Sequence, residues 1–311
     1  MLNAFHTLHT GGGGRSGPHF PHRGVVGRVH TLHTLLCDDV PMIRINGLFI
    51  YPIKSCRGIS LGDAEIATTG FANDRQWLVV DRHGVFMTQR DWPALAGVSV
   101  AVEDGGLRIQ VDGMAPLDVE TPGPTASLRP ATIWKDDCQV AAAGSGAAEW
   151  FTDYLGTPCR LVRMPDSTVR QVDLGYAEEG DRVGFADGFP FLLISQASLE
   201  ELNGRLDEPV PMDRFRPNIV VEGCAAHAED DWLHVTMGEV GFRVVKPCAR
   251  CVITTTDQAT GARGREPLRT LATYRRFGRE VLFGQNLIHD GTGTVRVGDP
   301  VEVNQVMGDG E

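Results

Sequence analysis

The chain has 311 residues, of which 42% are hydrophobic and 22% are charged, a composition typical of globular proteins. Its formal net charge of −11 argues against nucleic acid or an anionic membrane as a partner, because both select basic surfaces. No apolar run reaches the roughly 18 residues that a membrane-spanning helix needs. Seven scattered cysteines suggest a reducing compartment, so we expect a cytoplasmic location.

Residues 1–41 differ in composition from the rest of the chain. They hold six of the ten histidines and a run of four glycines, and no acidic residue precedes Asp38. We interpret them as a disordered leader outside the fold. A histidine-rich metal-binding tail and an organelle transit peptide are the alternatives, although the glycine run does not favour the amphipathic helix of a transit peptide. The fold is expected to begin near Met42.

From Met42 to about residue 165, short apolar runs alternate with turn signals, which predicts a mostly β region. Lys54 and Ser55 follow the first of these runs, and on their own they would indicate only a solvated turn after an edge strand. Arg75 precedes a hairpin signal over residues 77–87. It is either a surface charge or a ligand for an anion.

Two helices are predicted with their caps. The first covers Ser145–Leu155, where Ser145 can cap the start and Gly156 can end the helix. The second follows the apolar strand Phe191–Ile194, and the spacing of Ser198 and Glu201 resembles a capping box at its start.

The densest group of reactive residue types lies in the run Lys246–Asp257. Cys248 and Cys251 stand beside two cations, and nearby positive charge favours the thiolate, which attacks electrophiles and binds soft metals. The β-branched residues Val252–Thr256 predict a strand after the second thiol. A Cys-x-x-Cys pair alone is compatible with a redox pair, half of a zinc site or two ordinary thiols.

A second polar motif precedes the apolar run Ile219–Val221. Arg216 and Asn218 flank Pro217 there, at the expected mouth of a strand. They either cap an edge strand or offer hydrogen-bond donors that converge on an anion.

These motifs together resemble the MOSC domain, the molybdenum-cofactor domain of the amidoxime-reducing enzymes and their bacterial relatives. The run Tyr51–Ser55 resembles the opening motif of the domain that precedes MOSC in that family. The resemblance covers most of the chain and implies a strand-rich α+β fold. It places a MOSC N-terminal β-barrel-like domain over residues 42–165, a MOSC β-barrel domain with a few helices over 166–304, and a tail over 305–311.

The resemblance also implies a function, the reduction of N-hydroxylated compounds (hydroxylamines, amidoximes and N-hydroxylated bases) to amines by a molybdenum-cofactor oxidoreductase. Cys251 maps onto the protein ligand of molybdenum. Other positions that match cofactor-facing motifs are Lys54, Ser55, Arg75, Gly188, Phe189, Arg216, Asn218 and Arg250. Relatives can carry small hydroxyl residues where Gly188 and Phe189 stand, so these two would act through backbone groups. Cys248 is interpreted as a small packing residue, with a persulfide carrier or second redox thiol as the alternative.

Two other functions use the same thiols. Cys224 and His227 precede Cys248 and Cys251 at a spacing compatible with a structural zinc site, which would make the domain a binding module without catalysis. A sulfur carrier that uses the Cys248/Cys251 pair is the other alternative. The zinc site would leave Lys54, Arg75 and the Arg-Pro-Asn motif unexplained.

The source of electrons is expected to be a separate protein. The sequence shows neither a cluster-binding set of cysteines nor a glycine fingerprint for a flavin or nicotinamide nucleotide. A ferredoxin- or cytochrome-type donor with its reductase would therefore supply the electrons, and the other partner would be a small N-hydroxylated substrate.

Overall fold

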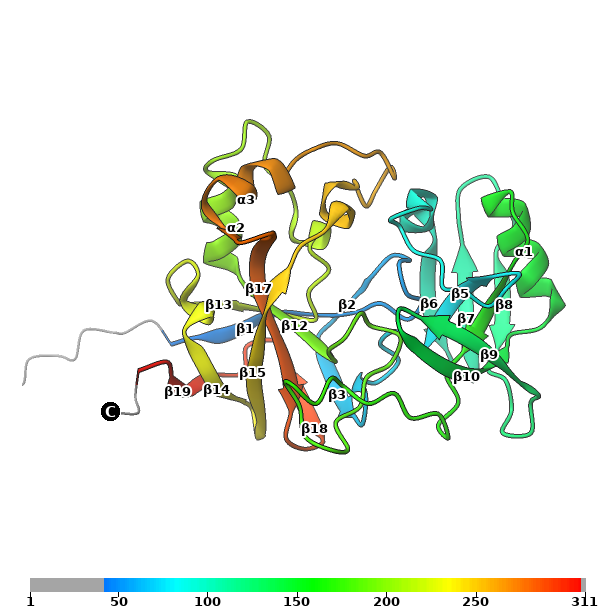
Figure 1. Cartoon of the computed structure of the whole chain (residues 1–311), viewed down its shortest axis with the longest axis horizontal. Coiled ribbons are helices and arrows are strands. Elements are labelled where there is room, and N and C mark those ends of the chain that lie inside the picture. The colour runs from blue at the N-terminus through cyan, green and yellow to red at the C-terminus, as the bar shows by residue number, and fades with distance from the viewer. Residues whose placement is uncertain (1–41, 309–311) are drawn as a thin grey trace, which may run out of the picture. The chain divides into compact units, whose positions relative to one another are not determined.

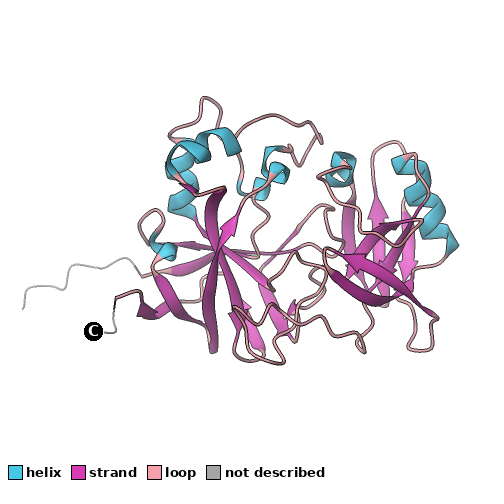
Figure 2. Cartoon of the chain, in the orientation of Figure 1, coloured by secondary structure: helices cyan, strands magenta, loops and turns pink. Residues whose placement is uncertain are grey.

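The structure is a computed structural model that describes residues 42–308, so the expectations for residues 1–41 and for the last three residues lie outside it. Strands dominate the described part of the chain, with a few helices, as expected (Figures 1 and 2). The helices are α1 (Ser145–Leu155), α2 (Gln196–Asn203) and α3 (Leu268–Tyr274). Within the described residues, no helix is both long and apolar enough to cross a membrane.

The largest sheet combines strands from both ends of the described chain. Its path runs β19-β14-β15-β17-β12-β13-β1-β2, and the short β16 pairs with β17. These strands are β1 (Arg44–Ile50), β2 (Ile59–Leu61), β12 (Phe191–Ser195), β13 (Ile219–Glu222), β14 (Trp232–Met237), β15 (Val240–Ala249), β16 (Arg276–Phe277), β17 (Glu280–His289) and β19 (Val301–Val306).

Strand pairing in two sheets crosses the domain boundary that we expected near residue 165. In the large sheet, β1 pairs antiparallel with β13, so that Leu48 faces Ile219. A second sheet joins β18 (Gly293–Arg296) to β3 (Asp63–Ala67) and β4 (Gly70–Phe71). Strands β1 and β3, which precede residue 165 in the sequence, are therefore part of sheets whose other strands include β13 and β18, which follow it.

The core of this region also draws on both sides of the boundary. The ring of Phe71 lies 4.9 Å from that of Phe191, and Phe191 lies 5.4 Å from Phe242, in each case edge to face. All three side chains are fully buried. Edge-to-face pairs add about 0.5–1.5 kcal/mol each beyond the area that they bury.

The middle of the chain forms two further sheets of its own. One has the order β5-β11-β10-β9 and the other β6-β7-β8. Their strands are β5 (Trp77–Asp81), β6 (Ser99–Glu103), β7 (Gly106–Gln110), β8 (Leu117–Glu120), β9 (Leu128–Ile133), β10 (Asp136–Ala142) and β11 (Cys159–Arg163). Helix α1 buries Trp150 and Phe151 in the core beside them.

Helix α1 has the predicted bounds, but its predicted cap is wrong. Gly144 occupies the N-cap position and no side chain caps the helix there, whereas Gly156 ends it in the left-handed conformation as expected. Glycine suits that ending because it carries no Cβ to clash at positive φ.

Helix α2 begins earlier than the predicted capping box. Ser195 is the N-cap, and its hydroxyl accepts a hydrogen bond from the Ser198 backbone N–H at 3.1 Å. The buried carboxylate of Glu229 accepts the Ser195 N–H at 3.0 Å, which is the bond that a capping-box glutamate would make. Glu201 is thus not needed for the cap and instead pairs with Arg205.

The strand predicted over Val252–Thr256 is absent, and a short 3-10 helix covers Val252–Thr255 instead. The hydroxyls of Thr254 and Thr255 donate to the carbonyls three residues earlier, at 3.0 and 2.8 Å. Such local side-chain bonds offer the backbone an alternative to a sheet ladder. Cys251 therefore lies two residues after the end of β15, immediately before the 3-10 helix.

Candidate functional site

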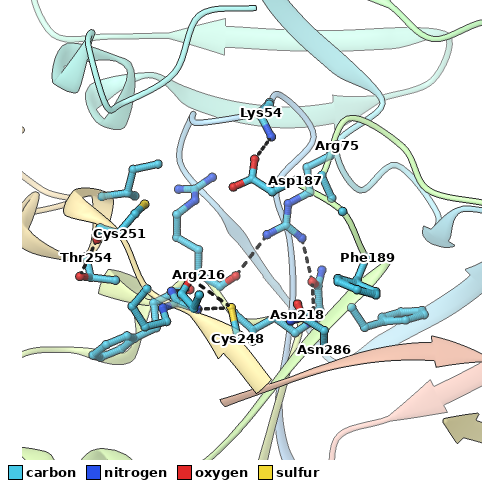
Figure 3. A pocket seen from close by; sticks show the side chains of 18 of the residues that line it. Lys54, Arg75, Asp187, Phe189, Arg216, Asn218, Cys248, Cys251, Thr254 and Asn286 are labelled. Carbon is cyan, nitrogen blue, oxygen red and sulfur yellow. Dashed lines mark hydrogen bonds and ion pairs between the residues drawn. The ribbon is translucent and has the colours of Figure 1, made fainter. Parts of the chain in front are cut away.

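One cavity of about 170 Å³ brings together all nine residues that the motifs singled out. It is large enough for an organic group, since a single water needs only about 10–15 Å³ of comparable volume. Its lining includes Lys54, Ser55, Arg75, Gly188, Phe189, Arg216, Asn218, Arg250 and Cys251. Figure 3 shows Cys251 and Phe189 on opposite sides of the view of this cavity, with Arg216 between them.

Lys54 is buried in the cavity wall and pairs with a carboxylate that the motifs did not predict. Its ammonium donates to Asp187 Oδ1 at 2.5 Å (Figure 3) and to the Phe185 carbonyl at 2.7 Å. The lysine side chain is 7% exposed, whereas that of Asp187 is 52% exposed. Burial lowers the pKa of Lys54 to about 8, despite the opposing effect of Asp187.

Arg90 approaches the same carboxylate from the other side. Its guanidinium donates to Asp187 Oδ2 at 2.8 Å and lies 4.6 Å from the ring of Trp134. Burial alone would lower the pKa of Arg90, but the Asp187 carboxylate and the Cys251 thiol outweigh it, so the pKa lies above its ordinary value. Asp187 in turn has a lowered pKa because its ion pairs with Lys54 and Arg90 favour the carboxylate form.

Arg75 and Arg216 both lie against the ring of Tyr51. Their guanidinium carbons are 4.4 and 4.1 Å from the ring centroid, a distance typical of cation–π contacts. The ring packs closely against Gly58, where an added Cβ would lie 2.5 Å from it, so a side chain at position 58 would displace the ring. Burial raises the pKa of Tyr51 to about 12, and its hydroxyl donates to the Pro217 carbonyl at 3.0 Å. The tyrosine ring therefore contacts two of the cations that line the cavity.

The buried amide of Asn218 positions Arg75. Its Oδ1 accepts from the Arg75 guanidinium at 2.7 Å and from the Leu192 N–H at 3.3 Å, and its Nδ2 donates to the Phe49 carbonyl at 3.1 Å. Most of its hydrogen-bonding capacity is thus used within the protein. Asp74 accepts a second bond from Arg75 at 2.6 Å.

Two buried glutamines connect the remaining anchors. Gln89 and Gln258 exchange hydrogen bonds of 2.9 and 3.0 Å. Gln89 also donates to the Ser55 carbonyl at 2.7 Å, and Gln258 accepts from Arg216 at 3.2 Å. The amide pair thereby fixes the backbone of Ser55, whose φ of 69° is unusual for a residue other than glycine.

The two thiols have different surroundings. Cys248 accepts a hydrogen bond from Arg250 at 3.0 Å and packs beside a hydrophobic core cluster. Cys251 is half-buried, its backbone carbonyl accepts from Thr254, and its thiol lies within electrostatic reach of Arg90. The Arg250 guanidinium therefore contacts the Cys248 thiol and not the Cys251 thiol.

The cavity wall has an excess of positive charge. Five cations line it, against a single carboxylate from Asp187; the cations are Lys54, Arg75, Arg90, Arg216 and Arg250. Arg90 and Arg250 each have a buried nitrogen without a hydrogen-bond partner in the described chain. Buried donors are almost always paired, so a buried nitrogen without a partner is a candidate contact for a ligand.

Sequence reasoning missed Arg90 as a lining residue and Asp187 as an ion-pair partner. Asp187 precedes Gly188 in a turn that did attract notice, but its pairing with Lys54 joins positions 133 residues apart. Arg90 follows a hairpin and belongs to no recognisable motif. Only the folded chain shows that it contacts the same carboxylate.

The arrangement does not support the zinc alternative. Within residues 42–308, no group of three or more His, Cys, Asp or Glu side chains is placed to hold a metal ion. Cys224 packs against the core around β1 and β13, whereas Cys248 packs against the cluster that contains Phe283. His227 lies 3.5 Å from Glu201 instead.

Comparison with known proteins identifies the family to which the chain belongs. The family described as MOSC N-terminal beta barrel domain matches residues 42–158, and the MOSC domain matches residues 180–302. The mouse protein named mitochondrial amidoxime-reducing component 1 is 38% identical over 82% of this chain and 80% of its own length. The chain therefore belongs to the MOSC-domain family of amidoxime-reducing components.

Two other relatives have similar names. The human mitochondrial amidoxime-reducing component 1 is 35% identical and covers 82% of this chain and 81% of its own length. The rat mitochondrial amidoxime reducing component 2 is 37% identical, with coverage of 83% and 82%. These names contradict the cytoplasmic location that we expected from the cysteine usage, because they place the relatives in mitochondria. Free thiols are therefore a poor guide to the compartment here.

Proposed function

We propose that this chain binds a molybdenum cofactor in the cavity and reduces N-hydroxylated compounds to the corresponding amines. The observation that carries the proposal is the meeting of a half-buried cysteine, Cys251, with five cations in one cavity. The names of the relatives, which describe amidoxime reduction, support the same activity.

The residues of the cavity fit the chemistry of this cofactor. A thiolate is a soft ligand that suits a metal already bound by sulfur, and a single cysteine is enough when the cofactor supplies the other ligands. The phosphate of the pterin is an anion, and charge-assisted hydrogen bonds to such groups are short and strong. Among residues 42–308, one buried nitrogen of Arg90 and one of Arg250 have no hydrogen-bond partner and offer two donors to such an anion.

Each lining residue takes a role that follows from its geometry. Cys251 holds the metal. Lys54, Arg75 and Arg216 attract the anionic part of the cofactor, and the backbone of Ser55 and of the Gly188–Phe189 turn borders it. Asn218 positions Arg75, and Arg250 uses its unpartnered nitrogen. Cys248, which Arg250 already engages, packs behind the site.

When bound, the cofactor supplies the two-electron chemistry that no side chain offers. In the overall reaction the N–O bond of the substrate breaks, two electrons and two protons are consumed, and an N–H group and water are formed. The chain contributes the metal ligand, the positive charge and a cavity wall that limits access of water. A separate protein delivers the electrons one at a time.

Metal and pterin analysis of protein made in a molybdenum-replete host tests the proposal. We expect molybdenum and an extractable pterin in equal amounts, and reduction of benzamidoxime to benzamidine when reduced viologen supplies electrons. NADH or NADPH alone should give no turnover. Zinc without pterin would contradict the proposal, and persulfide on Cys251 during incubation with a sulfur donor, without reductase activity, would favour the sulfur-carrier alternative.

A further inference from the structure

A short stretch of this acidic protein is strongly basic. Residues 261–279 contain six arginines and one glutamate, although the chain as a whole has a net charge of −11. The stretch includes helix α3 (Figure 1) and ends in the turn between β16 and β17. A local excess of this size creates a positive potential on an otherwise negative surface.

Only part of this charge is neutralised by the fold. Arg275 pairs with Asp230 at 2.5 Å and Arg269 pairs with Glu266 at 2.6 Å. Among residues 42–308, no carboxylate forms an ion pair with Arg265, Arg276 or Arg279, and all three side chains are exposed. Their charge is directed to the solvent.

The β16–β17 hairpin presents an aromatic side chain between two of these arginines. Phe277 is 59% exposed at its tip, with Arg276 before it and Arg279 two residues after it. Gly278 has a φ of 61° in the two-residue connection, the conformation that glycine supplies in tight hairpin turns. An exposed aromatic ring with flanking arginines has the composition of interface hot spots.

The base of the hairpin is fixed and joins the cysteine run. Arg276 pairs with Val281 across the hairpin, and the Val281 carbonyl accepts the backbone N–H of Arg250 at 2.7 Å. Leu282 pairs with Ala249 in the neighbouring strand. The hairpin is thus hydrogen-bonded directly to the segment that ends at Cys251.

We propose that the β16–β17 hairpin, with Phe277, Arg276 and Arg279 at its tip, is the docking surface for an acidic electron-donor protein. This inference rests on the proposed function, which requires electrons from outside the chain. Opposite charges steer encounter and fix orientation, while the negative remainder of the surface repels an acidic partner elsewhere. The hydrogen-bonded link to Arg250 favours a donor protein over an anionic membrane, because a donor has to approach the redox centre.

Charge reversal separates docking from catalysis. Acidic ferredoxins and small cytochromes, each with its reductase, are first compared as donors to the wild-type protein. The donor that gives the fastest turnover of benzamidoxime is then used for all variants. In R276E/R279E we expect the donor concentration for half-maximal rate to rise at least tenfold at low salt. The difference should shrink in 1 M salt, where the Debye length is about 3 Å. F277S should lower the donor-driven rate roughly tenfold, and this effect should depend less on salt than the effect of R276E/R279E.

Turnover with reduced viologen is the internal control, and it should stay at the wild-type rate in both R276E/R279E and F277S. R129E/R160E carries the same change in net charge on exposed positions of β9 and β11, and it should behave as wild type. Equal loss in both double variants would show a net-charge effect and overturn the assigned surface.

Other results would also contradict the proposal. Unchanged donor kinetics in R276E/R279E would place docking elsewhere, and loss of viologen-driven turnover would show that the arginines serve the active site. If R276E/R279E lost binding to vesicles that contain phosphatidylserine but kept normal donor kinetics, the hairpin would be a membrane contact. Absence of viologen-driven turnover in the wild type would instead refute the proposed function itself.

Discussion

The two walls of the cavity are built on different principles. The cation wall (Lys54, Arg75, Arg90 and Arg216) is held by protein partners, including two carboxylates, a buried asparagine and the ring of Tyr51. The cysteine wall (Cys248, Cys251 and Thr254) ends a strand, and the second thiol has few partners. A buried charge is costly unless it is paired, so the cations need an existing framework. A metal ligand instead needs an accessible lone pair.

The strongest test of this difference removes one sulfur at a time. Cys251→Ser should abolish molybdenum binding and lower the reduction of benzamidoxime to background, because a serine hydroxyl is a poor ligand for a soft metal site. Cys248→Ser should retain the metal and most of the activity, since this thiol accepts from Arg250 and donates to the Ala249 carbonyl, contacts that a serine hydroxyl can also make. Metal analysis of both purified variants decides the assignment, and the reverse pattern would exchange the roles of the two thiols.

Removal of single cations should weaken the cation wall without destroying it. Lys54→Ala, Arg75→Ala and Arg216→Ala each delete charge-assisted contacts, which are worth about 1.5–3 kcal/mol. We therefore expect cofactor retention after dilution to fall roughly tenfold or more in each variant. Arg44→Ala, which removes an exposed arginine of β1, is the matched control and should change nothing. Full retention in all three test variants would show that the anion binds elsewhere.

The cation wall should also respond to pH. Because burial lowers the pKa of Lys54 to about 8, the positive charge is present below that pH and is lost as the pH rises through it. A bound anion favours the protonated form, so cofactor retention should decline above about pH 8, by up to tenfold per pH unit. Lys54→Arg keeps its charge at alkaline pH and should flatten this profile. An identical profile in that variant would assign the loss to another group.

The smallest effect is expected at the turn that borders both walls. Gly188 has open space where a Cβ would lie, and its φ is not in the left-handed region. Gly188→Ser should therefore change the free energy of unfolding by less than about 0.5 kcal/mol in denaturant titrations. A larger loss would show that the glycine is needed for close approach of the backbone.

Much of the site could be predicted from the sequence because its residues belong to compact motifs. Lys54, Arg216 and Cys251 each stand in a short and specific run, and the structure gathers them in one cavity. Arg90 could not be found this way, because its role depends on a contact with Asp187 across 97 residues. Roles assigned to the individual residues remain predictions, because proximity in a cavity does not identify a ligand.

Local structure was predicted less well where a side chain competes with the expected pattern. The run after Cys251 is rich in β-branched residues, yet the hydroxyls of Thr254 and Thr255 bond to nearby carbonyls and close a 3-10 helix. The start of α2 depends on Glu229, which is far from the helix in the sequence. Propensity cannot report either effect, because each is decided by a particular hydrogen bond.

The pairing of early strands with late ones constrains how the protein is made. During synthesis, β1 and β3 leave the ribosome well before their partners β13 and β18 exist. Contacts between distant parts of a chain make folding slow, and unpaired strands are exposed to aggregation until the partners arrive. Lys54 and Arg75 therefore meet Cys251 only after translation has nearly finished. We expect the cofactor to enter a finished chain, so that its supply controls maturation and not the start of folding.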